Sequence, residues 1–283
     1  MGNTVDFSFF NDGIDFAPYV DVSLYPKPIL QDTPPQLYSL GFVVADVMAE
    51  PSWGGYYSVS SGYYDDQIEY LRKEEKEVIV SFGGAEGTEL AQVLSGDELV
   101  QKYASVILRY DLKYIDFDIE GNVLKDKIAN RVRAKAIAEL KKLYPKLHVS
   151  LTVAVMPYGF DQDVLELIKQ TPCDMVNIMA MNYGDEPDMF KATVDAAKAA
   201  REQVCKDIGI TVMIGENDTG EIFSLADARY LNRHVKTYFK WVKRLSFWSL
   251  NRDNGNKRSM EKSSMIDQEL FEFSRIFENK CFC

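Results

Sequence analysis

Eight apolar segments of β type recur along the chain, and segments with helical periodicity lie between them. The apolar segments cover residues 16–23, 38–45, 77–82, 113–120, 147–156, 174–182, 210–215 and 244–250. Strands that alternate with helices pair in parallel, because each helix returns the chain to the same edge of the sheet. Eight such units without a linker favour a closed (β/α)8 TIM barrel over an open doubly wound sheet, so the expected fold class is α/β.

The length of the chain fits one such barrel. A (β/α)8 barrel typically takes about 250 residues, and this chain has 283. The helical segments include residues 125–143, 189–205 and 224–239, and Asp or Ser residues stand where they cap several of these segments. No glycine-rich phosphate loop of the GxGxxG or GxxxxGK type follows the first apolar segment, which weakens the nucleotide-binding alternative. Residues 1–283 are therefore expected to form one domain.

Charge and composition argue against several kinds of partner. The chain carries 43 acidic and 32 basic residues, a formal net charge of −11, and no basic stripe interleaved with aromatic residues. Nucleic acid is therefore not an expected partner. No apolar run approaches the roughly 18 residues of a membrane span, so no membrane partner is expected. Aromatic residues reach 12%, which suits flat, uncharged polar ligands such as sugars. We expect a monomer.

The cysteines and the first residues bear on the compartment. Cys173, Cys205, Cys281 and Cys283 are too few for a disulfide scaffold, and none has zinc-site spacing. They are expected to be buried or tail thiols, with a bridge between Cys173 and Cys205, or between the tail pair, as the alternative in a secreted protein. Residues 1–10 lack a signal-peptide pattern. The expected location is extracellular with the signal removed, and cytoplasmic and lysosomal locations stay open.

Three carboxylates, Asp116, Asp118 and Glu120, alternate with large apolar residues in the segment 113–120. Side chains in a strand alternate faces with a period of two, so the carboxylates share one face. A strand this apolar is usually covered on both sides, which turns the carboxylates toward a confined interior where an unpaired charge is costly. The cluster therefore indicates chemistry, with a divalent-metal site or a solvated strand end as alternatives.

The working groups of such a barrel lie at the carboxyl ends of its strands. Aromatic, amide and thioether side chains follow several of the other strands, and the residues expected to contact substrate are Trp53, Met179, Met181, Asn182, Tyr183, Asn217 and Trp248. Packing in the core is the alternative for the tryptophans and methionines. Asn217 also begins a glycosylation sequon, so a glycan at this position is the alternative to a substrate contact.

Glu120 is the expected proton donor, because it lies nearest the open mouth and has the longest side chain of the triplet. Asp118 projects from the same strand toward the same side, so the two like charges raise one of the two pKa values, which would keep Glu120 protonated. Asp118 is badly placed to attack a sugar from the opposite side. A 2-acetamido group of the substrate can serve as nucleophile instead, with Asp118 orienting it and Asp116 behind. The placement of the three carboxylates therefore indicates N-acetylglucosamine substrates.

Two motifs resemble glycoside hydrolase family 18. Residues 115–120 (IDFDIE) match the DxDxE core of the family signature, and residues 81–84 (SFGG) match its SxGG motif on strand three. Residues 179–183 are similar to the strand-six motif, and Trp248 stands where the family keeps a tryptophan. Segments such as 16–21, 40–46 and 247–253 look especially like the chitinase D-type branch. The resemblance covers about residues 14–255.

The resemblance implies a chitinase that cleaves chitin or chito-oligosaccharides with retention, through an oxazolinium intermediate, with no metal or cofactor. Glu120 would be the acid/base, Asp118 the acetamide-orienting group, Asp116 its partner and Trp248 the floor beneath the sugar. Asn182 or Tyr183 would contact the acetamide, although the strand-six motif often reads Met-x-Tyr-Asp and tyrosine comes one place later here. Endo action is expected, with exo action as the alternative.

Two rival functions accompany this expectation. An endo-β-N-acetylglucosaminidase that cuts the core of N-glycans would use the same acid and acetamide chemistry. A chitin-binding lectin on the same fold would have no activity, and the usual mark of such lectins is the loss of the glutamate, whereas Glu120 is present here.

Overall fold

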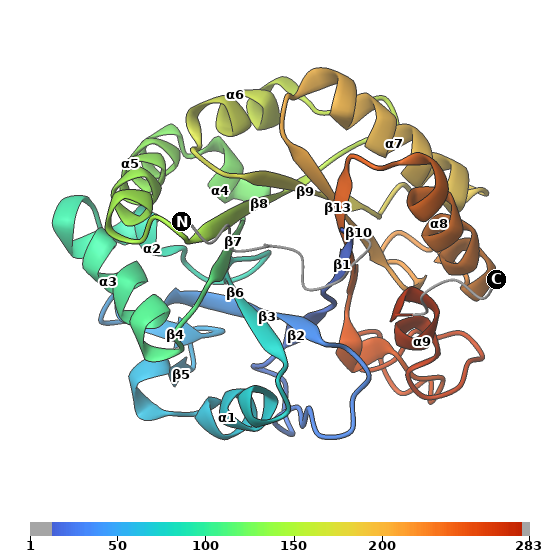
Figure 1. Cartoon of the computed structure of the whole chain (residues 1–283), viewed down its shortest axis with the longest axis horizontal. Helices are drawn as coiled ribbons and strands as arrows, with labels where there is room; N and C mark the ends of the chain where they lie inside the picture. The colour runs from blue at the N-terminus through green and yellow to red at the C-terminus, as the bar shows by residue number, and fades with distance from the viewer. Residues whose placement is uncertain (1–12, 279–283) are drawn as a thin grey trace, which may run out of the picture.

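Parallel strands form the centre of the protein, and helices surround them (Figure 1). In this computed structural model, which describes residues 13–278, the strands of the barrel neighbour one another in the order β1-β13-β10-β9-β8-β7-β6-β3. Their bounds are Asp15–Phe16 (β1), Tyr19–Asp21 (β2), Leu37–Ala45 (β3), Glu77–Gly83 (β6), Tyr114–Asp118 (β7), His148–Ala154 (β8), Met175–Ala180 (β9), Asp207–Met213 (β10) and Val242–Trp248 (β13). All eight segments expected as strands contain one, with ends that differ by a few residues.

The first strand position consists of two short pieces, β1 and β2, and these pieces close the barrel. β1 pairs in parallel with β13, and β2 pairs in parallel with β3. Between them, the Ala17 N–H donates to the Leu245 carbonyl (3.0 Å) and the Ser39 N–H donates to the Pro18 carbonyl (2.9 Å). Pro18 has no N–H for a strand ladder, which accounts for the interruption. The last strand is thereby joined to the second, and the expected α/β barrel is confirmed.

Helices connect most of the strands and cover the outside of the barrel (Figure 1). Their bounds are Asp65–Lys73 (α1), Leu90–Val93 (α2), Gly96–Arg109 (α3), Gly121–Lys125 (α4), Lys127–Leu143 (α5), Gln162–Gln170 (α6), Met189–Gln203 (α7), Leu225–Tyr238 (α8) and Glu272–Glu278 (α9). The connection between β2 and β3, residues 22–36, contains no helix, which corrects the expectation of a helix in every unit. Four prolines stand in this connection, and proline in a helix interior removes a hydrogen bond and clashes with the preceding turn.

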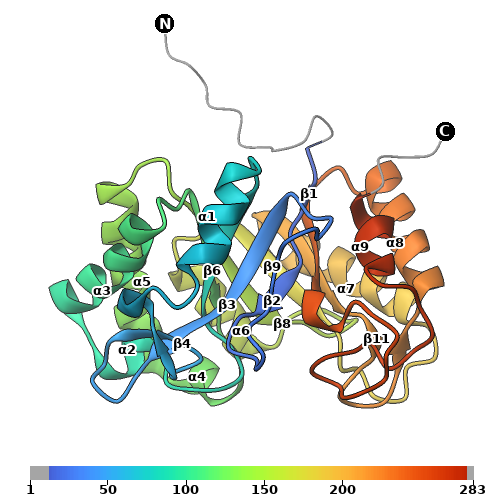
Figure 2. The ribbon, with the colours of Figure 1, turned by 90° about the horizontal axis from the view of Figure 1, so that it is seen from below.

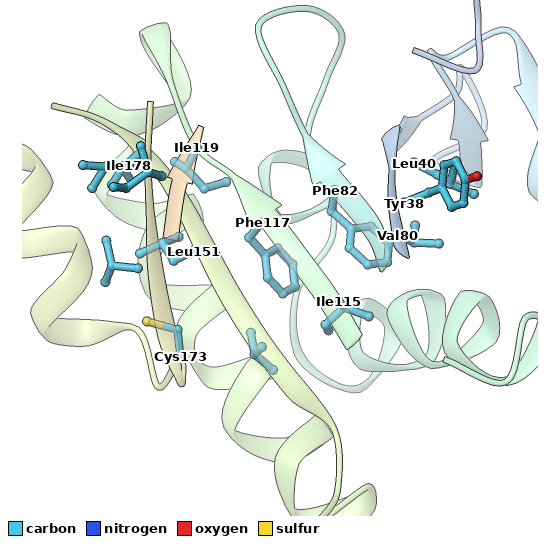
Figure 3. Packing of buried hydrophobic residues seen from close by; sticks show 14 of the residues in the cluster. Tyr38, Leu40, Val80, Phe82, Ile115, Phe117, Ile119, Leu151, Cys173 and Ile178 are labelled. Atoms are coloured by element: carbon cyan, nitrogen blue, oxygen red, sulfur yellow. The ribbon is translucent and has the colours of Figure 1, made fainter. Parts of the chain in front are cut away.

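Strand β7 is buried on both of its faces. On the outer face, the ring of Phe117 stacks on Phe82 of β6, with centroids 5.3 Å apart (Figure 3). The same ring meets Tyr103 of α3 edge-on at 5.2 Å. Burying a side chain of this size stabilises a fold by about 1.5–3 kcal/mol. The outer face therefore anchors β7 against β6 and α3, and the carboxylates Asp116 and Asp118 point to the interior of the barrel.

Short elements gather at the end of the barrel where the strands finish (Figure 2). They are β4 (Pro51–Trp53) and β5 (Tyr57–Ser58) after β3, α4 after β7, the hairpin of β11 (Gly215–Glu216) and β12 (Ile222–Phe223), and the 3-10 turns Val59–Ser61 and Leu250–Arg252. β4 pairs with β3 in antiparallel fashion, so the chain doubles back along the mouth before α1 begins. These short elements therefore surround the end of the barrel at which its strands finish.

Two of the four cysteines lie within residues 13–278. Cys173 is buried, Cys205 is exposed and both are free thiols, so the bridge considered between them is absent. Cys281 and Cys283 lie outside the described residues. Every described helix falls short of the length and apolarity that crossing a membrane requires. The expectation of a single domain over residues 1–283 stays a prediction.

Candidate active site

A cavity of about 510 Å³ lies at the mouth of the barrel, and most of the expected site residues line it. Of the residues expected from the sequence, Asp118, Glu120, Met179, Met181, Asn182 and Trp248 line the cavity. Tyr19, Asp21, Phe42, Tyr56, Thr152 and Asp218 line it as well. The carboxyl ends of β2, β7, β9 and β13 thus meet at one hollow, as the barrel rule predicts.

Asp116 lies beneath the cavity and accepts four hydrogen bonds from hydroxyl groups. The parallel register places it between Ser81 of β6 and Ser150 of β8. Ser81 donates to Oδ2 (2.7 Å) and Ser150 to Oδ1 (2.6 Å), while Tyr19 donates to Oδ2 (2.9 Å) and Thr152 to Oδ1 (2.8 Å). Both carboxylate oxygens of Asp116 are therefore occupied by hydroxyl donors. With its oxygens occupied in this way, Asp116 suits a supporting charge better than a metal ligand.

Asp118 lines the cavity, and one of its carboxylate oxygens is left without a hydrogen-bond partner by the described residues. Its side chain is 4% exposed, and its Oδ1 atom has no hydrogen-bond partner among the described residues. A buried acceptor without a donor is costly, so the position is suited to a ligand that brings an N–H or O–H group. Burial raises the pKa of Asp118 well above its usual range, and the negative charges of Glu120 and Asp116 raise it further.

Glu120 follows β7 at the rim of the cavity and is half-buried. Its backbone is extended, with φ −140° and ψ 177°, and its side chain does not cap α4, although it precedes that helix. Burial raises the pKa of Glu120, and the negative charge of Asp218 raises it further. Two neighbouring carboxyls with raised pKa values hold protons in common. The arrangement can therefore keep a proton at the rim for transfer to a ligand.

Trp248, at the end of β13, forms an aromatic wall with residues from β2 and β3. Its ring is stacked on Phe42, with centroids 5.7 Å apart and planes 18° apart, and lies 6.3 Å from the ring of Tyr19. Phe42 in turn lies against Gly84, where an added Cβ would come within 2.7 Å of the ring. A half-buried indole in such a wall provides a flat apolar surface on which a sugar ring can stack.

Asn182 and Asp218 join the loop after β9 to the hairpin after β10. The Asn182 amide donates to the Asp218 carboxylate (3.0 Å), and the Asp218 N–H donates to Asn182 Oδ1 (3.0 Å). Asn217 does not line the cavity: it is buried, accepts from the Asn182 N–H (3.2 Å) and donates to the carbonyls of Met213 and Gly215. Its structural role replaces the expected substrate contact and the glycan alternative, because the amide is already occupied.

Trp53 and Tyr183 also depart from the expected substrate contacts. Trp53 is fully buried beside Tyr64 and Tyr110, with ring centroids 6.3 and 6.1 Å away, because the antiparallel strand β4 directs it into the core. Tyr183 is held through its N–H by Glu221 (2.5 Å), and its hydroxyl is buried without lining the cavity. These placements correct both expectations.

Gly83 is required where β6 meets β7. Its φ is +99°, and an added Cβ would collide with the carbonyl oxygen of Asp118. Gly83→Ala is therefore expected to lower the free energy of unfolding by more than the roughly 1–3 kcal/mol of a strained backbone. Gly96→Ala is the matched control, since Gly96 also has positive φ (+58°) but open space around it. Urea unfolding of both variants measures the difference, and equal losses would contradict the steric role of Gly83.

A family model and curated relatives match the chain. The model described as glycosyl hydrolases family 18 matches residues 59–206. A probable bifunctional chitinase/lysozyme of Escherichia coli (strain K12) is 25% identical, with 93% of this chain and 34% of the relative covered. Endochitinase 11 of Metarhizium anisopliae is also 25% identical, with 84% of this chain and 52% of the relative covered. The chain thus spans about a third to a half of the length of these relatives.

Solved structures match the fold over most of its length. The catalytic domain of a hyperthermophilic chitinase from Pyrococcus furiosus superimposes with a TM-score of 0.81 at 27% identity, over 94% of both chains. Catalytic-site mutants of active domain 2 of the thermostable chitinase from the same organism, in complex with chito-oligosaccharides, give 0.80 at 27% identity, over 94% of this chain and 93% of that one.

Proposed function

The chain belongs to glycosyl hydrolase family 18, and from this we propose that it hydrolyses β-1,4 bonds between N-acetylglucosamine units of chitin or chito-oligosaccharides. The observation that carries the proposal is that Asp118 and Glu120 line one cavity and that a buried oxygen of Asp118 has no hydrogen-bond partner among the described residues. An acetamido N–H is the donor that this acceptor lacks. The similarity to chitinases of known structure supports the same substrate class.

The bond is broken with the help of the substrate's own acetamido group. Glu120 donates its proton to the glycosidic oxygen as the bond to the anomeric carbon breaks. The acetamido carbonyl oxygen attacks that carbon and forms an oxazolinium ring, while Asp118 accepts the acetamido N–H and faces the positive charge that develops. Trp248 supports the sugar ring from below. No second carboxylate is needed as nucleophile.

Proton sharing in the site fits these roles. When an acetamido N–H reaches Asp118, it stabilises the ionised form of that carboxyl, so the shared proton stays on Glu120. Asp116, held in place by four hydroxyl donors, supports Asp118 from behind. In the second step, water attacks the anomeric carbon as the bond from that carbon to the acetamido oxygen breaks, which restores the acetamido group, and Glu120 takes a proton from the attacking water. Two inversions at one carbon give net retention.

The proposal is tested by offering three substrates to the purified protein. Chitotetraose is expected to be cleaved, with the β-anomer of the product appearing first in NMR spectra. Cleavage of a high-mannose glycopeptide in place of chitotetraose would overturn the proposed substrate, and an α-anomeric first product would overturn retention. Cellotetraose, which lacks N-acetyl groups, should resist, and a rate similar to that of chitotetraose would refute the acetamido step. Binding of chitotetraose without any cleavage would indicate a lectin.

Asp218→Asn is expected to move the alkaline limb of the pH profile of kcat to lower pH. Glu120 must be protonated to act, and the negative charge of Asp218 helps to raise its pKa. Without that charge the pKa falls and the acid form is lost at lower pH, while asparagine still accepts from Asn182. Asp185→Asn, an exposed carboxylate of the adjoining loop outside the cavity, should leave the limb in place. An unmoved limb in Asp218→Asn would contradict this role.

The location outside the cell, the monomeric state, endo action and the chitinase D-type branch stay predictions from the sequence. They do not affect the chemistry proposed for the cavity.

A further inference from the structure

The lining of the cavity carries carboxylates from several sides and no lysine or arginine. The carboxylates are Asp21, Glu86, Asp118, Glu120, Asp218 and Glu261. We propose that the cavity favours chitin that is partly deacetylated, with a cationic glucosamine unit next to the N-acetylglucosamine unit that is cleaved. This inference rests on the proposed function and names the substrate class more narrowly.

The outer carboxylates surround the cavity rather than forming one patch. Asp21 ends β2, Glu86 follows β6, Asp218 lies in the β11–β12 hairpin and Glu261 lies in the segment after β13. None of these four forms an ion pair within residues 13–278, whereas many surface carboxylates elsewhere in the protein do so, for example Asp163 with Lys127. Charges of one sign around a hollow add their potentials and attract a cation into it.

Asp21 is the most firmly positioned of the four. Its Oδ1 accepts from the Ser23 N–H (2.9 Å) and the Ser23 hydroxyl (2.7 Å). Its backbone is tied to Asn251, which accepts from the Asp21 N–H (2.9 Å) and donates to the Asp21 carbonyl (3.1 Å). No described residue donates to Oδ2. Tyr25 and Tyr56, 82% and 80% exposed, line the same cavity and offer rings on which a sugar can stack.

A second observation restricts where the cationic unit can bind. The unit at Asp118 must keep its N-acetyl group, because the acetamido oxygen is the proposed nucleophile and the buried Asp118 oxygen lacks a donor. A glucosamine unit is therefore productive only at a neighbouring position, where the outer carboxylates stand. The free amine of this unit is protonated in mildly acidic solution. The unit therefore carries a positive charge at the position where N-acetylglucosamine has its acetamido group. The site thus requires an N-acetyl group on the unit that is cleaved and favours a positively charged unit next to it.

The test compares kcat/KM for fully acetylated chitotetraose with that for tetramers that carry one glucosamine unit at a defined position. At mildly acidic pH and low salt, at least one glucosamine tetramer should be cleaved about twofold to fivefold more efficiently, the size expected for an exposed charge pair. The ratio of kcat/KM for the glucosamine tetramer to kcat/KM for chitotetraose should fall toward one in 0.5 M salt, because salt screens exposed charges. Mass spectrometry of the products identifies the positions of the glucosamine unit.

Substitutions of the outer carboxylates test whether they cause the preference for the glucosamine tetramer. Asp21→Asn and Glu86→Gln should each lower the ratio, and the double variant should lower it further, whereas Glu69→Gln on the exposed face of α1 should leave it unchanged. A ratio of one or less for every tetramer, or a ratio insensitive to salt and to Asp21→Asn, would overturn the inference. In that case cleavage of chitotetraose would still stand for the proposed function, and failure to cleave chitotetraose would sink that function itself.

Discussion

Glu120→Gln is expected to lower kcat for chitotetraose by about 10²–10⁴-fold, the range that a positioned general acid contributes. Glutamine keeps the size of the side chain at the rim of the cavity but has no acidic proton to give to the glycosidic oxygen. The affinity for substrate should change little, because the aromatic wall at Trp248 and the acceptor at Asp118 remain. Release of reducing ends measures kcat, and calorimetry with chitotetraose measures binding.

Glu216→Gln is the matched control for this experiment. Glu216 is a half-buried glutamate of β11 that does not line the cavity, so its substitution should leave kcat close to the wild-type value. Equal activity of Glu120→Gln and the unmodified protein would refute the assignment of Glu120 as proton donor, and with it the proposed mechanism.

Asp118→Asn is expected to lower kcat by roughly 10²–10³-fold, comparable with the loss of one preorganised electrostatic group. Asparagine still has an oxygen that accepts the acetamido N–H, but it carries no charge to face the oxazolinium ring. The rate with chitotetraose measures the loss. A rate within a few-fold of wild type would show that the acetamido group reacts without help from this carboxylate.

The same substitution is expected to stabilise the fold at neutral pH. The pKa of Asp118 is raised by folding, so the folded state disfavours its ionised form. Stability is therefore lost as the pH rises above the pKa of the unfolded chain, and a neutral amide removes that loss. The Tm of Asp118→Asn should exceed that of the wild type at pH 7, and the gain should shrink in acid. If the Tm of Asp118→Asn at pH 7 were lower than that of the wild type, the loss of activity would be explained by misfolding instead.

The alternation of apolar and helical segments predicted the barrel because strand and helix periods are local properties of the sequence. The inward direction of Asp116 and Asp118 followed from the same period of two. The absence of a helix from the segment 22–36 is predictable from the sequence, because the prolines of this segment argue against a helix. The rule that residues after the carboxyl end of a barrel strand lie at the active site does not hold for Trp53. β4 runs antiparallel to β3 and directs this tryptophan into the core.

The missed residues of the cavity owe their positions to contacts between distant segments. Phe42 lines it because its ring stacks on Trp248, more than two hundred residues later. Asp218 does so because the hairpin after β10 exchanges hydrogen bonds with Asn182. Neither pairing leaves a periodic trace in the sequence. Asn217 and Asp218 are adjacent in one sequon, yet one is buried and the other faces the cavity, which only the hairpin geometry decides.

The division of the first strand position into β1 and β2 has a consequence for synthesis of the chain. The side chain of Ser246 donates to the Ala17 carbonyl across a separation of 229 residues, and the backbone pairing of β1 with β13 spans a similar distance. At translation rates of about 5–20 residues per second, residues 15–21 emerge from a ribosome roughly 10–50 seconds before β13 exists. During that interval the barrel cannot close, and the free edges of its strands are open to wrong partners. The barrel is therefore expected to close only after β13 has been synthesised.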